Sequence, residues 1–172
     1  MTVQLQTPPL TDAFKTAFGG HPAGVAVITA DSGSGPVGIT ASSVASVSAE
    51  PPLLAFSLAA NSGSAAAIAI ADSVVVHLLS ATNLNLARIF ADARAERFTD
   101  SMAWSRMDSG EPLLAHDGYS LRCTILSRTP AGGSLLLAAE VVEIIAPLTV
   151  GSPMVYHRRA FHSLGEHSVL AG

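Results

Sequence analysis

The residues best suited to chemistry lie between Pro36 and Ser64, a stretch rich in serine and threonine and almost free of charge. Glu50 is its one charged residue. The stretch is too polar for an ordinary core and too apolar for a solvated loop. We therefore expect two strands whose backbone and hydroxyl groups line a site for a planar ligand, neutral or anionic. The hydroxyl residues are Thr40, Ser42, Ser43, Ser46, Ser48, Ser57, Ser62 and Ser64.

The end of this stretch predicts a site for an anion. Ser64 opens the alanine-rich run 65–71, which has the composition of a helix. The N–H groups in the first turn of a helix have no partner within the helix. Together with nearby hydroxyls they form a binding site for an anionic group.

Motifs for catalysis by the protein's own side chains are missing from the sequence. It contains no GxSxG, no GxxxxGK[ST] and no GxGxxG opening a helix. Glu140 and Glu143 fall on opposite faces of one expected strand, which argues against a two-carboxylate glycosidase. If the chain is an enzyme, a cofactor performs the difficult chemistry and the protein places it.

The histidines and the single cysteine do not predict a metal site. His157 and His162 would lie on opposite faces of a strand, and no HExxH or Cys–His set accompanies them. His77 lies in a run of valine and leucine and is expected to be a core or interface histidine with its polar atoms paired. Cys123 is expected to be a small core residue. One cysteine cannot form an internal disulfide, which fits a reducing cytoplasm.

Composition predicts one domain that pairs with a second copy. The chain has 172 residues, with a loose arm expected over 1–9 and the domain over 10–166. Only 13% of residues are charged, against about 25% in typical domains, so we expect a large apolar homodimer face.

Charge and hydropathy exclude two classes of partner. The formal charge is −4, and the basic pair Arg158–Arg159 is the longest basic cluster, so nucleic-acid binding is not expected. No run approaches the about 20 apolar residues of a membrane span, and residues 1–10 do not resemble a secretory signal. We therefore expect a cytoplasmic protein that does not bind membranes.

Hydrophobic periodicity and turn residues predict antiparallel β-structure with inserted helices. Leu10, Phe14 and Phe18 recur at the spacing of a helix that Gly19–Gly20 ends. Two further helices are expected over 65–71 and after Asn83, and the charged region 92–117 is expected to be loosely structured. Hairpin signals at 31–35 and 129–133 favour a closed antiparallel sheet. The expected strands are 24–29, 37–46, 53–58, 74–79, 119–127, 134–145 and 154–158.

Several segments resemble the flavin reductase-like, FMN-binding split-barrel family, which contains the small reductase components of two-component flavin monooxygenases. The resemblance implies a mostly β fold, a six-stranded antiparallel split barrel, and a homodimer with flavin in a groove at the dimer face. The specific segments are PAGVAVIT (22–29), GITASSVASVSAEPPLLAFSL (38–58) and NSGS (61–64), with weaker support from ERF (96–98) and MVYHRRAFHSL (154–164).

The resemblance also implies roles for individual residues. Phe98 would close the flavin pocket, Gly24 would shape its floor with Pro22, and the nicotinamide nucleotide would face Pro22, His157 and Arg158. Flavin would contact Gly38, Thr40, Ala41, Ser42 and Ser43 along its ring and ribityl chain, Ser57 and Leu58 behind the isoalloxazine, and Asn61, Ser62 and Ser64 at its phosphate.

The activity implied is reduction of FMN or FAD by hydride transfer from NADH or NADPH, with reduced flavin passing to a partner monooxygenase. Such a transfer depends on stacking and distance more than on an acid or base. Two alternatives stay open: a non-catalytic flavin-binding protein, and a self-contained FMN-dependent oxidase.

Two positions depart from the family pattern. Ala60 stands where a basic residue is often found near the phosphate, and His77 stands where asparagine is common. If N–H groups and hydroxyls alone hold the phosphate, flavin binding should be weak, with FMN and FAD exchangeable.

Overall fold

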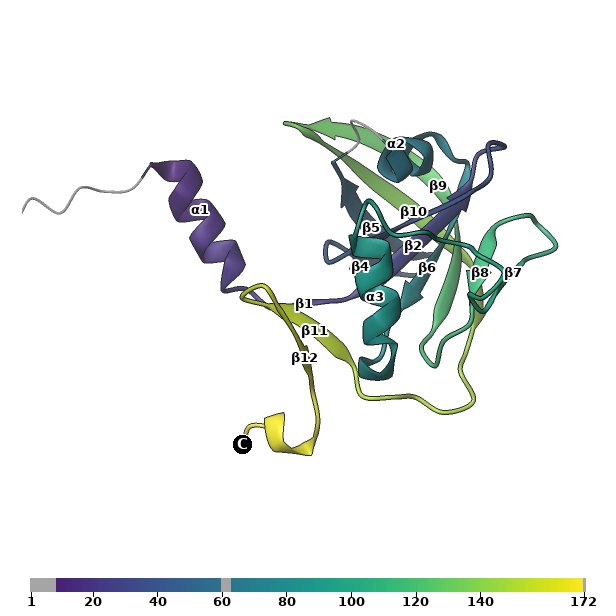
Figure 1. Ribbon diagram of the computed structural model, residues 1–172. Helices are drawn as coiled ribbons and strands as arrows, with labels where there is room; N and C mark the ends of the chain where they lie inside the picture. Colours follow the sequence, from purple (N-terminus) through teal and green to yellow (C-terminus); the bar gives the residue numbers. More distant parts are fainter. Residues whose placement is uncertain (1–8, 60–62, 172) are drawn as a thin grey trace, which may run out of the picture.

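A seven-stranded antiparallel sheet is the frame of the computed structural model, which describes residues 9–59 and 63–171 (Figure 1). The strand order is β3-β2-β6-β9-β10-β5-β4. The expected mostly β class is therefore confirmed. The strands are β2 (Ala26–Asp31), β3 (Pro36–Ala41), β4 (Ala45–Ala49), β5 (Pro52–Leu58), β6 (Ser73–Leu78), β9 (Ser120–Ala131) and β10 (Ser134–Ile145).

The expectation of six strands is wrong because the segment 37–46 is not one strand. β3 ends at Ala41 and β4 begins at Ala45, and these two strands are the first and last of the sheet. The intervening residues 42–44 can span at most about 14 Å between the flanking Cα atoms. The sheet must therefore curve until its two edges lie near each other at this crossing.

The main core packs apolar side chains of the sheet against helix α2 (Gly63–Ile70). Ile28 of β2, Phe56 of β5 and Leu137 of β10 are fully buried there, as is Ile68 of α2. Burying each such side chain stabilises the fold by about 1.5–3 kcal/mol. Cys123 belongs to this core, as expected, and burial raises the pKa of its thiol to about 12.

A second apolar cluster forms where helix α3 (Leu84–Ala91), which follows the short η1 (Ala81–Asn83), packs beside the sheet. Phe90 of α3 is buried in this cluster. The expectation that 92–117 is loosely structured is incomplete, because the region includes a short antiparallel pair, β7 (Trp104–Arg106) and β8 (Pro112–Leu114). Leu114 of β8 is also buried in the cluster.

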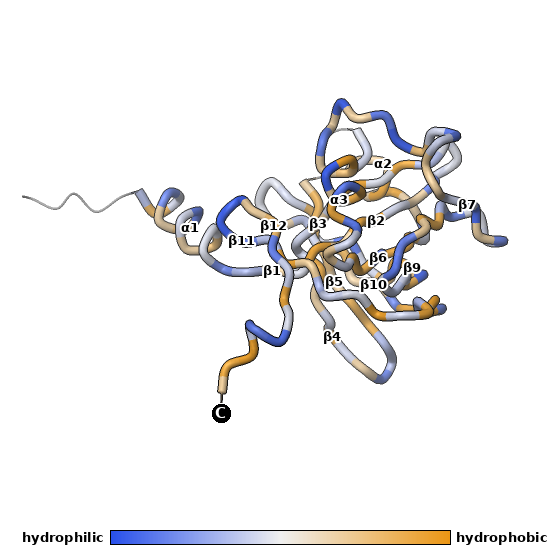
Figure 2. The backbone as a smooth tube through the Cα atoms, turned by 60° about the horizontal axis from the view of Figure 1, so that its bottom comes forward, coloured by the Kyte–Doolittle hydropathy of each residue, from blue (hydrophilic) through white to orange (hydrophobic). Residues whose placement is uncertain are grey.

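A second, smaller sheet is separate from the seven-stranded sheet. It consists of β1 (Ala23–Gly24), β11 (Met154–His157) and β12 (Ala160–Ser163). Helix α1 (Leu10–Gly19) extends from it, and none of its residues is buried (Figure 1). The tail beyond η2 (Glu166–Ser168) also projects from the sheets with hydrophobic residues (Figure 2). Among the described residues, no helix has the length and apolar character needed to cross a membrane.

His77 is confirmed as a core histidine whose two ring nitrogens are paired. Its Nε2 accepts a hydrogen bond from the Leu114 N–H at 3.0 Å, so the proton lies on Nδ1, which donates to the Val27 carbonyl at 3.1 Å. Burial, followed by the neighbouring His116, lowers the pKa of His77 to about 3. Protonating Nε2 would break the bond from Leu114 and bury a charge.

This arrangement predicts acid-sensitive stability. Between the unfolded pKa of about 6.5 and the folded value of about 3, the unfolded chain binds more protons, so stability falls as pH falls through that window. From pH 7 to pH 4.5 the free energy of unfolding should drop by about 2–3 kcal/mol from this group. Urea unfolding at both values measures it.

The matched variants are His77→Gln and His167→Gln. His77→Gln should lower stability at pH 7 yet flatten its dependence on pH, leaving the smaller contribution of His116, whose pKa burial also lowers. His167 is exposed, so His167→Gln should behave as wild type. An unchanged pH slope in His77→Gln would contradict the prediction.

Candidate functional site

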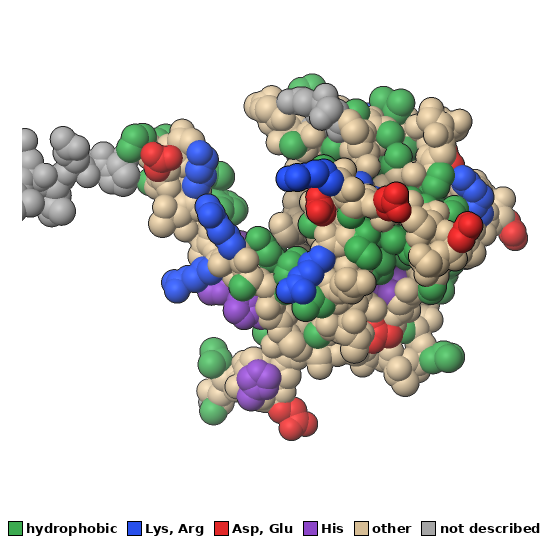
Figure 3. All heavy atoms as spheres, in the orientation of Figure 1, with side chains coloured by type: hydrophobic (Ala, Val, Ile, Leu, Met, Phe, Trp, Pro, Cys, Tyr) green, Lys and Arg blue, Asp and Glu red, His purple; other side chains and the backbone are tan. Residues whose placement is uncertain are grey.

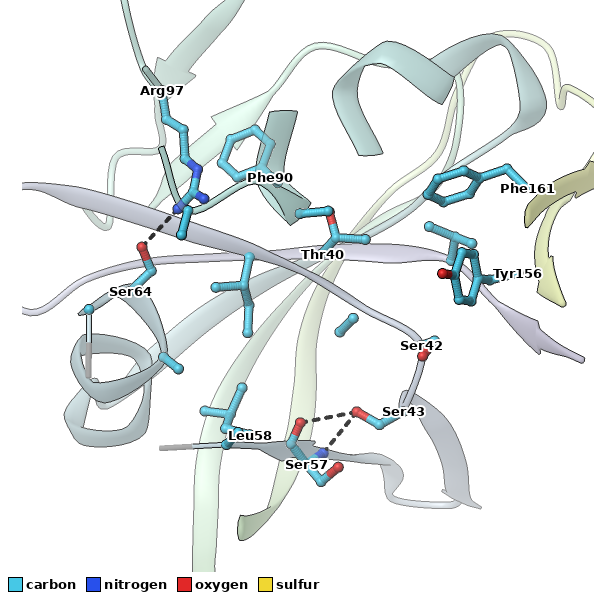
Figure 4. A pocket seen from close by; sticks show the side chains of 18 of the residues that line it. Thr40, Ser42, Ser43, Ser57, Leu58, Ser64, Phe90, Arg97, Tyr156 and Phe161 are labelled. Carbon is cyan, nitrogen blue, oxygen red and sulfur yellow. Dashed lines mark hydrogen bonds between the residues drawn. The ribbon is translucent and has the colours of Figure 1, made fainter. Parts of the chain in front are cut away.

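A cavity of about 810 Å³ lies beside the 42–44 crossing, between the ends of β3 and β5, α2, α3 and the β11–β12 hairpin (Figure 4). Most residues expected to bind flavin lie around it. Those that line it are Thr40, Ala41, Ser42, Ser43, Ser57, Leu58 and Ser64.

Two of the expected ligand hydroxyls also form hydrogen bonds that join structural elements. Ser43 Oγ accepts a hydrogen bond from the Ser57 N–H and donates to the Ser57 carbonyl, both at 3.1 Å. This side chain extends the β4–β5 ladder past its last backbone pair. Thr40 Oγ1 donates to the Ala87 carbonyl at 2.6 Å and ties β3 to α3. Ser42 and Ser57 keep exposed positions on the cavity.

Arg97 is the residue that sequence reasoning missed. Its Nη1 donates to Ser64 Oγ and to the Gly38 carbonyl, each at 3.0 Å, and its guanidinium lies 5.7 Å from the centre of the Phe90 ring (Figure 4). Partial burial lowers the pKa of Arg97, but a guanidinium stays protonated in proteins. A permanent positive charge therefore lies at the start of α2.

This charge overturns the reason for expecting weak flavin binding. The prediction assumed that no basic side chain lies near the phosphate because Ala60 is not basic. Arg97 brings a guanidinium to Ser64 from a loop far along the chain. The sequence signal for this residue is the ERF motif at 96–98, in which Arg97 precedes Phe98.

Phe98, which was expected to close the flavin pocket, is not among the described residues that line the cavity. Its backbone has a φ of 57°, and its ring packs edge-on against Phe90 and Trp104, with centroids 5.4 and 5.1 Å apart. It supports Phe90, which does line the cavity. Gly38 is buried behind the lining, where its carbonyl binds Arg97.

The opposite end of the cavity is aromatic. Tyr156 of β11 and Phe161 of β12 line it, with ring centroids 5.0 Å apart (Figure 4). Arg159 of the hairpin turn also lines the cavity. Neither His157 nor Arg158 lines this cavity. Side chains alternate along a strand, so Tyr156 of β11 faces this cavity while the next residue, His157, does not.

The remaining expected residues lie elsewhere. The His157 ring lies beside that of His162, with centroids 5.7 Å apart, and Pro22 is exposed outside the cavity lining. Asn61 and Ser62 lie outside the described residues.

The geometry suits a planar ligand with an anionic tail. A cation and a hydroxyl meet at one end, small residues line the middle, and aromatic rings stand at the other end. The described lining holds no histidine, cysteine or carboxylate, and the described residues contain no group of three metal-ligating side chains. The site can bind and orient, and reacting groups must come with its ligands.

Comparison with known proteins gives consistent results. The chain matches the family model described as "Flavin reductase like domain" over residues 18–165. An NADH:FMN oxidoreductase of Rhodococcus erythropolis is 37% identical over 164 residues, which cover 94% of this chain and 85% of that protein. The reductase component of a 4-nitrophenol 4-monooxygenase/4-nitrocatechol 2-monooxygenase of Rhodococcus opacus is 32% identical and covers 89% and 81%.

A solved structure shares the fold. A flavin reductase domain protein from Arthrobacter sp. FB24 superposes with a TM-score of 0.85 at 35% identity, covering 91% of this chain and 96% of that one.

Gly38 gives a prediction about how the cavity is supported. A Cβ at this position would lie 2.5 Å from Phe90 Cε1 and 3.2 Å from Thr29 Cγ2. Gly38→Ala should therefore lower the free energy of unfolding by about 1–3 kcal/mol through overpacking, as measured by urea denaturation. Gly133→Ala is the control, because a Cβ there meets no atom within 4 Å. Equal stability of the two variants would contradict this account.

Proposed function

Because the chain belongs to the flavin reductase-like family, we propose that its cavity binds flavin and that it serves as the reductase component of a two-component monooxygenase. It is an NADH-dependent flavin reductase. The observation that supports this position for flavin is the hydrogen bond from Arg97 to Ser64 at the start of α2.

The cavity fits a flavin nucleotide in size and chemistry. Its volume of about 810 Å³ lies within the range of about 300–1,000 Å³ usual for cofactor sites. Arg97 and Ser64 would bind the phosphate, where a charge-assisted hydrogen bond is strong. The edge from Thr40 to Ser43 would face the ring system, with Tyr156 at its far end.

The bound flavin supplies the redox chemistry by accepting a hydride from NADH. The chain's part is to bind and orient the two nucleotides, which is the main source of rate when the reacting atoms only need to meet. The described lining contains no histidine, cysteine or carboxylate that could act as a general base on an organic substrate. That absence suits a reductase better than a self-contained oxidase. An assay of NADH oxidation distinguishes a reductase from a non-catalytic flavin-binding protein.

The product would be released to a monooxygenase. The match to a 4-nitrophenol monooxygenase reductase component supports a partner of this class, which the reduced flavin would reach by diffusion. NADH is supplied in the cytoplasm, where we infer that the reaction takes place.

The test is NADH oxidation by the purified chain with added FMN, FAD or riboflavin. Wild type should oxidise NADH only when flavin is present. Arg97→Met should raise the KM for FMN by about ten- to a hundredfold, because it removes a charged partner of the phosphate. The KM for riboflavin, which has no phosphate, should change less than threefold by the same reasoning.

Arg97→Lys is the matched control, since it keeps the charge and should recover part of the FMN affinity. If Arg97→Met weakened FMN and riboflavin equally, Arg97 would act through the fold rather than the phosphate. If wild type oxidised no NADH with any flavin, the proposed function would be wrong.

We also propose a homodimer, because apolar side chains are exposed on two faces of the single chain. On α1, Leu10 is 86% exposed and Phe14 and Phe18 are 58% and 62% exposed. On the outer side of the sheet, Leu136 and Ile144 of β10 are exposed as well. A second copy would remove these surfaces from water, as in obligate dimers.

Replacing both phenylalanines of α1 by aspartate should weaken the dimer. Phe14→Asp with Phe18→Asp places charges in an apolar contact and should shift the mass from dimer toward monomer in size-exclusion chromatography with light scattering. Thr11→Asp, an exposed polar position on the same helix, should leave the mass unchanged. A wild-type chain that is monomeric at micromolar concentration would contradict the proposal.

A further inference from the structure

A second cavity, of about 480 Å³, adjoins the first. It lies between the C-terminal half of α1 and the turn that joins β11 to β12, and Arg159 lines both cavities. Its lining contains Lys15 of α1 and Arg158 of the turn. Figure 3 shows cationic side chains gathered close to α1.

The three cations of this cavity lack a described carboxylate partner. Within 4.0 Å, the ion pairs among residues 9–59 and 63–171 are Arg106–Asp31 and Arg122–Glu111. Lys15, Arg158 and Arg159 therefore bring three positive charges to the lining of one cavity, and none of them forms a described ion pair within 4.0 Å. A concave surface that focuses one sign of charge attracts a ligand of the opposite sign.

The turn that carries two of these cations has an uncommon backbone. His157 pairs with Ala160, which leaves Arg158 and Arg159 as a two-residue hairpin loop, and their φ values are 48° and 62°. Glycine or asparagine usually occupies both positions of such a turn. The Arg158 N–H donates to the Gly19 carbonyl at 3.0 Å, which fixes the turn against the end of α1. Strained residues of this kind gather at ligand sites.

The position of this cationic cluster indicates which phosphate-bearing ligand it would bind. In the proposed function, the flavin phosphate is bound by Arg97 and Ser64, at the end of the first cavity away from Tyr156 and Phe161 (Figure 4). The adenylate of FAD is attached to that phosphate and would leave from the same end. A nicotinamide stacked on the flavin ring near Tyr156 would carry its own pyrophosphate toward Arg159.

We propose that Lys15, Arg158 and Arg159 bind the pyrophosphate of the nicotinamide dinucleotide. The inference rests on the proposed function for the position of the flavin. It assigns a site for the donor nucleotide that is separate from the flavin phosphate site and includes a residue of α1.

The test uses Arg158→Gly and Lys15→Met, singly and combined, with FMN at saturation. Each single variant should raise the KM for NADH about five- to tenfold, through loss of one solvent-exposed charged contact. The kcat and the KM for FMN should stay within twofold. Arg158→Gly also relieves the left-handed backbone, so its Tm should equal or exceed that of wild type. Arg88→Ala, an exposed arginine on α3, is the control.

A loss of donor affinity without a loss of stability distinguishes binding from a structural role. A double variant whose KM for NADH stays within twofold of wild type would overturn the proposal. So would a KM for FAD that rises in proportion to that for NADH, because the cluster would then serve the flavin's adenylate.

Direct binding of ADP, followed by calorimetry, separates this proposal from the proposed function. Wild type should bind ADP, more weakly in 0.5 M NaCl because salt screens exposed charges, and the double variant should bind at least tenfold more weakly. If wild type oxidised NADH but ADP bound equally to both proteins, the pyrophosphate site would be wrong while the function stood. If wild type oxidised no NADH, the function would fail and ADP binding would decide this site alone.

Discussion

The short connection from β3 to β4 is the constraint on which the structure depends. These strands lie at the two ends of a seven-stranded order, yet only residues 42–44 join them. The sheet must therefore curve, and the opening between its edges is where the cavity lies. Ser43 secures the crossing by binding both backbone groups of Ser57. A flat sheet of the same strands could not form this site.

Arg97 completes the site by joining segments that are distant in the sequence. It binds the β3 carbonyl of Gly38 and the α2 hydroxyl of Ser64 from the loop after α3. The same contacts hold the loop in place and leave a charge at the end of the cavity. If this charge also binds the flavin phosphate, as we propose, one guanidinium serves both the fold and the ligand, and flavins with and without a phosphate would separate the two roles.

Local patterns predicted the strands, α2 and the hydroxyl edge, because each depends on neighbours in sequence. His77 was also predicted from its apolar neighbours alone. The break at 42–44 was not, since small and β-branched residues continue through it with no proline or glycine. Arg97 was missed because its contacts depend on how a loop of 92–103 returns to the sheet. Tyr156 and Arg159 were not singled out, because which residues of the hairpin line the cavity depends on how the hairpin packs against the sheet.

Helix α1 makes few contacts with the body of its own chain, and one backbone bond from Arg158 fixes its end. Its apolar face is therefore held in place by whatever covers it. If a second copy covers it, Lys15 is positioned by assembly, so subunit association and affinity for the hydride donor are thermodynamically linked. Dilution would then lower the affinity for NADH while each chain stays folded. NADH binding would in turn favour the associated state.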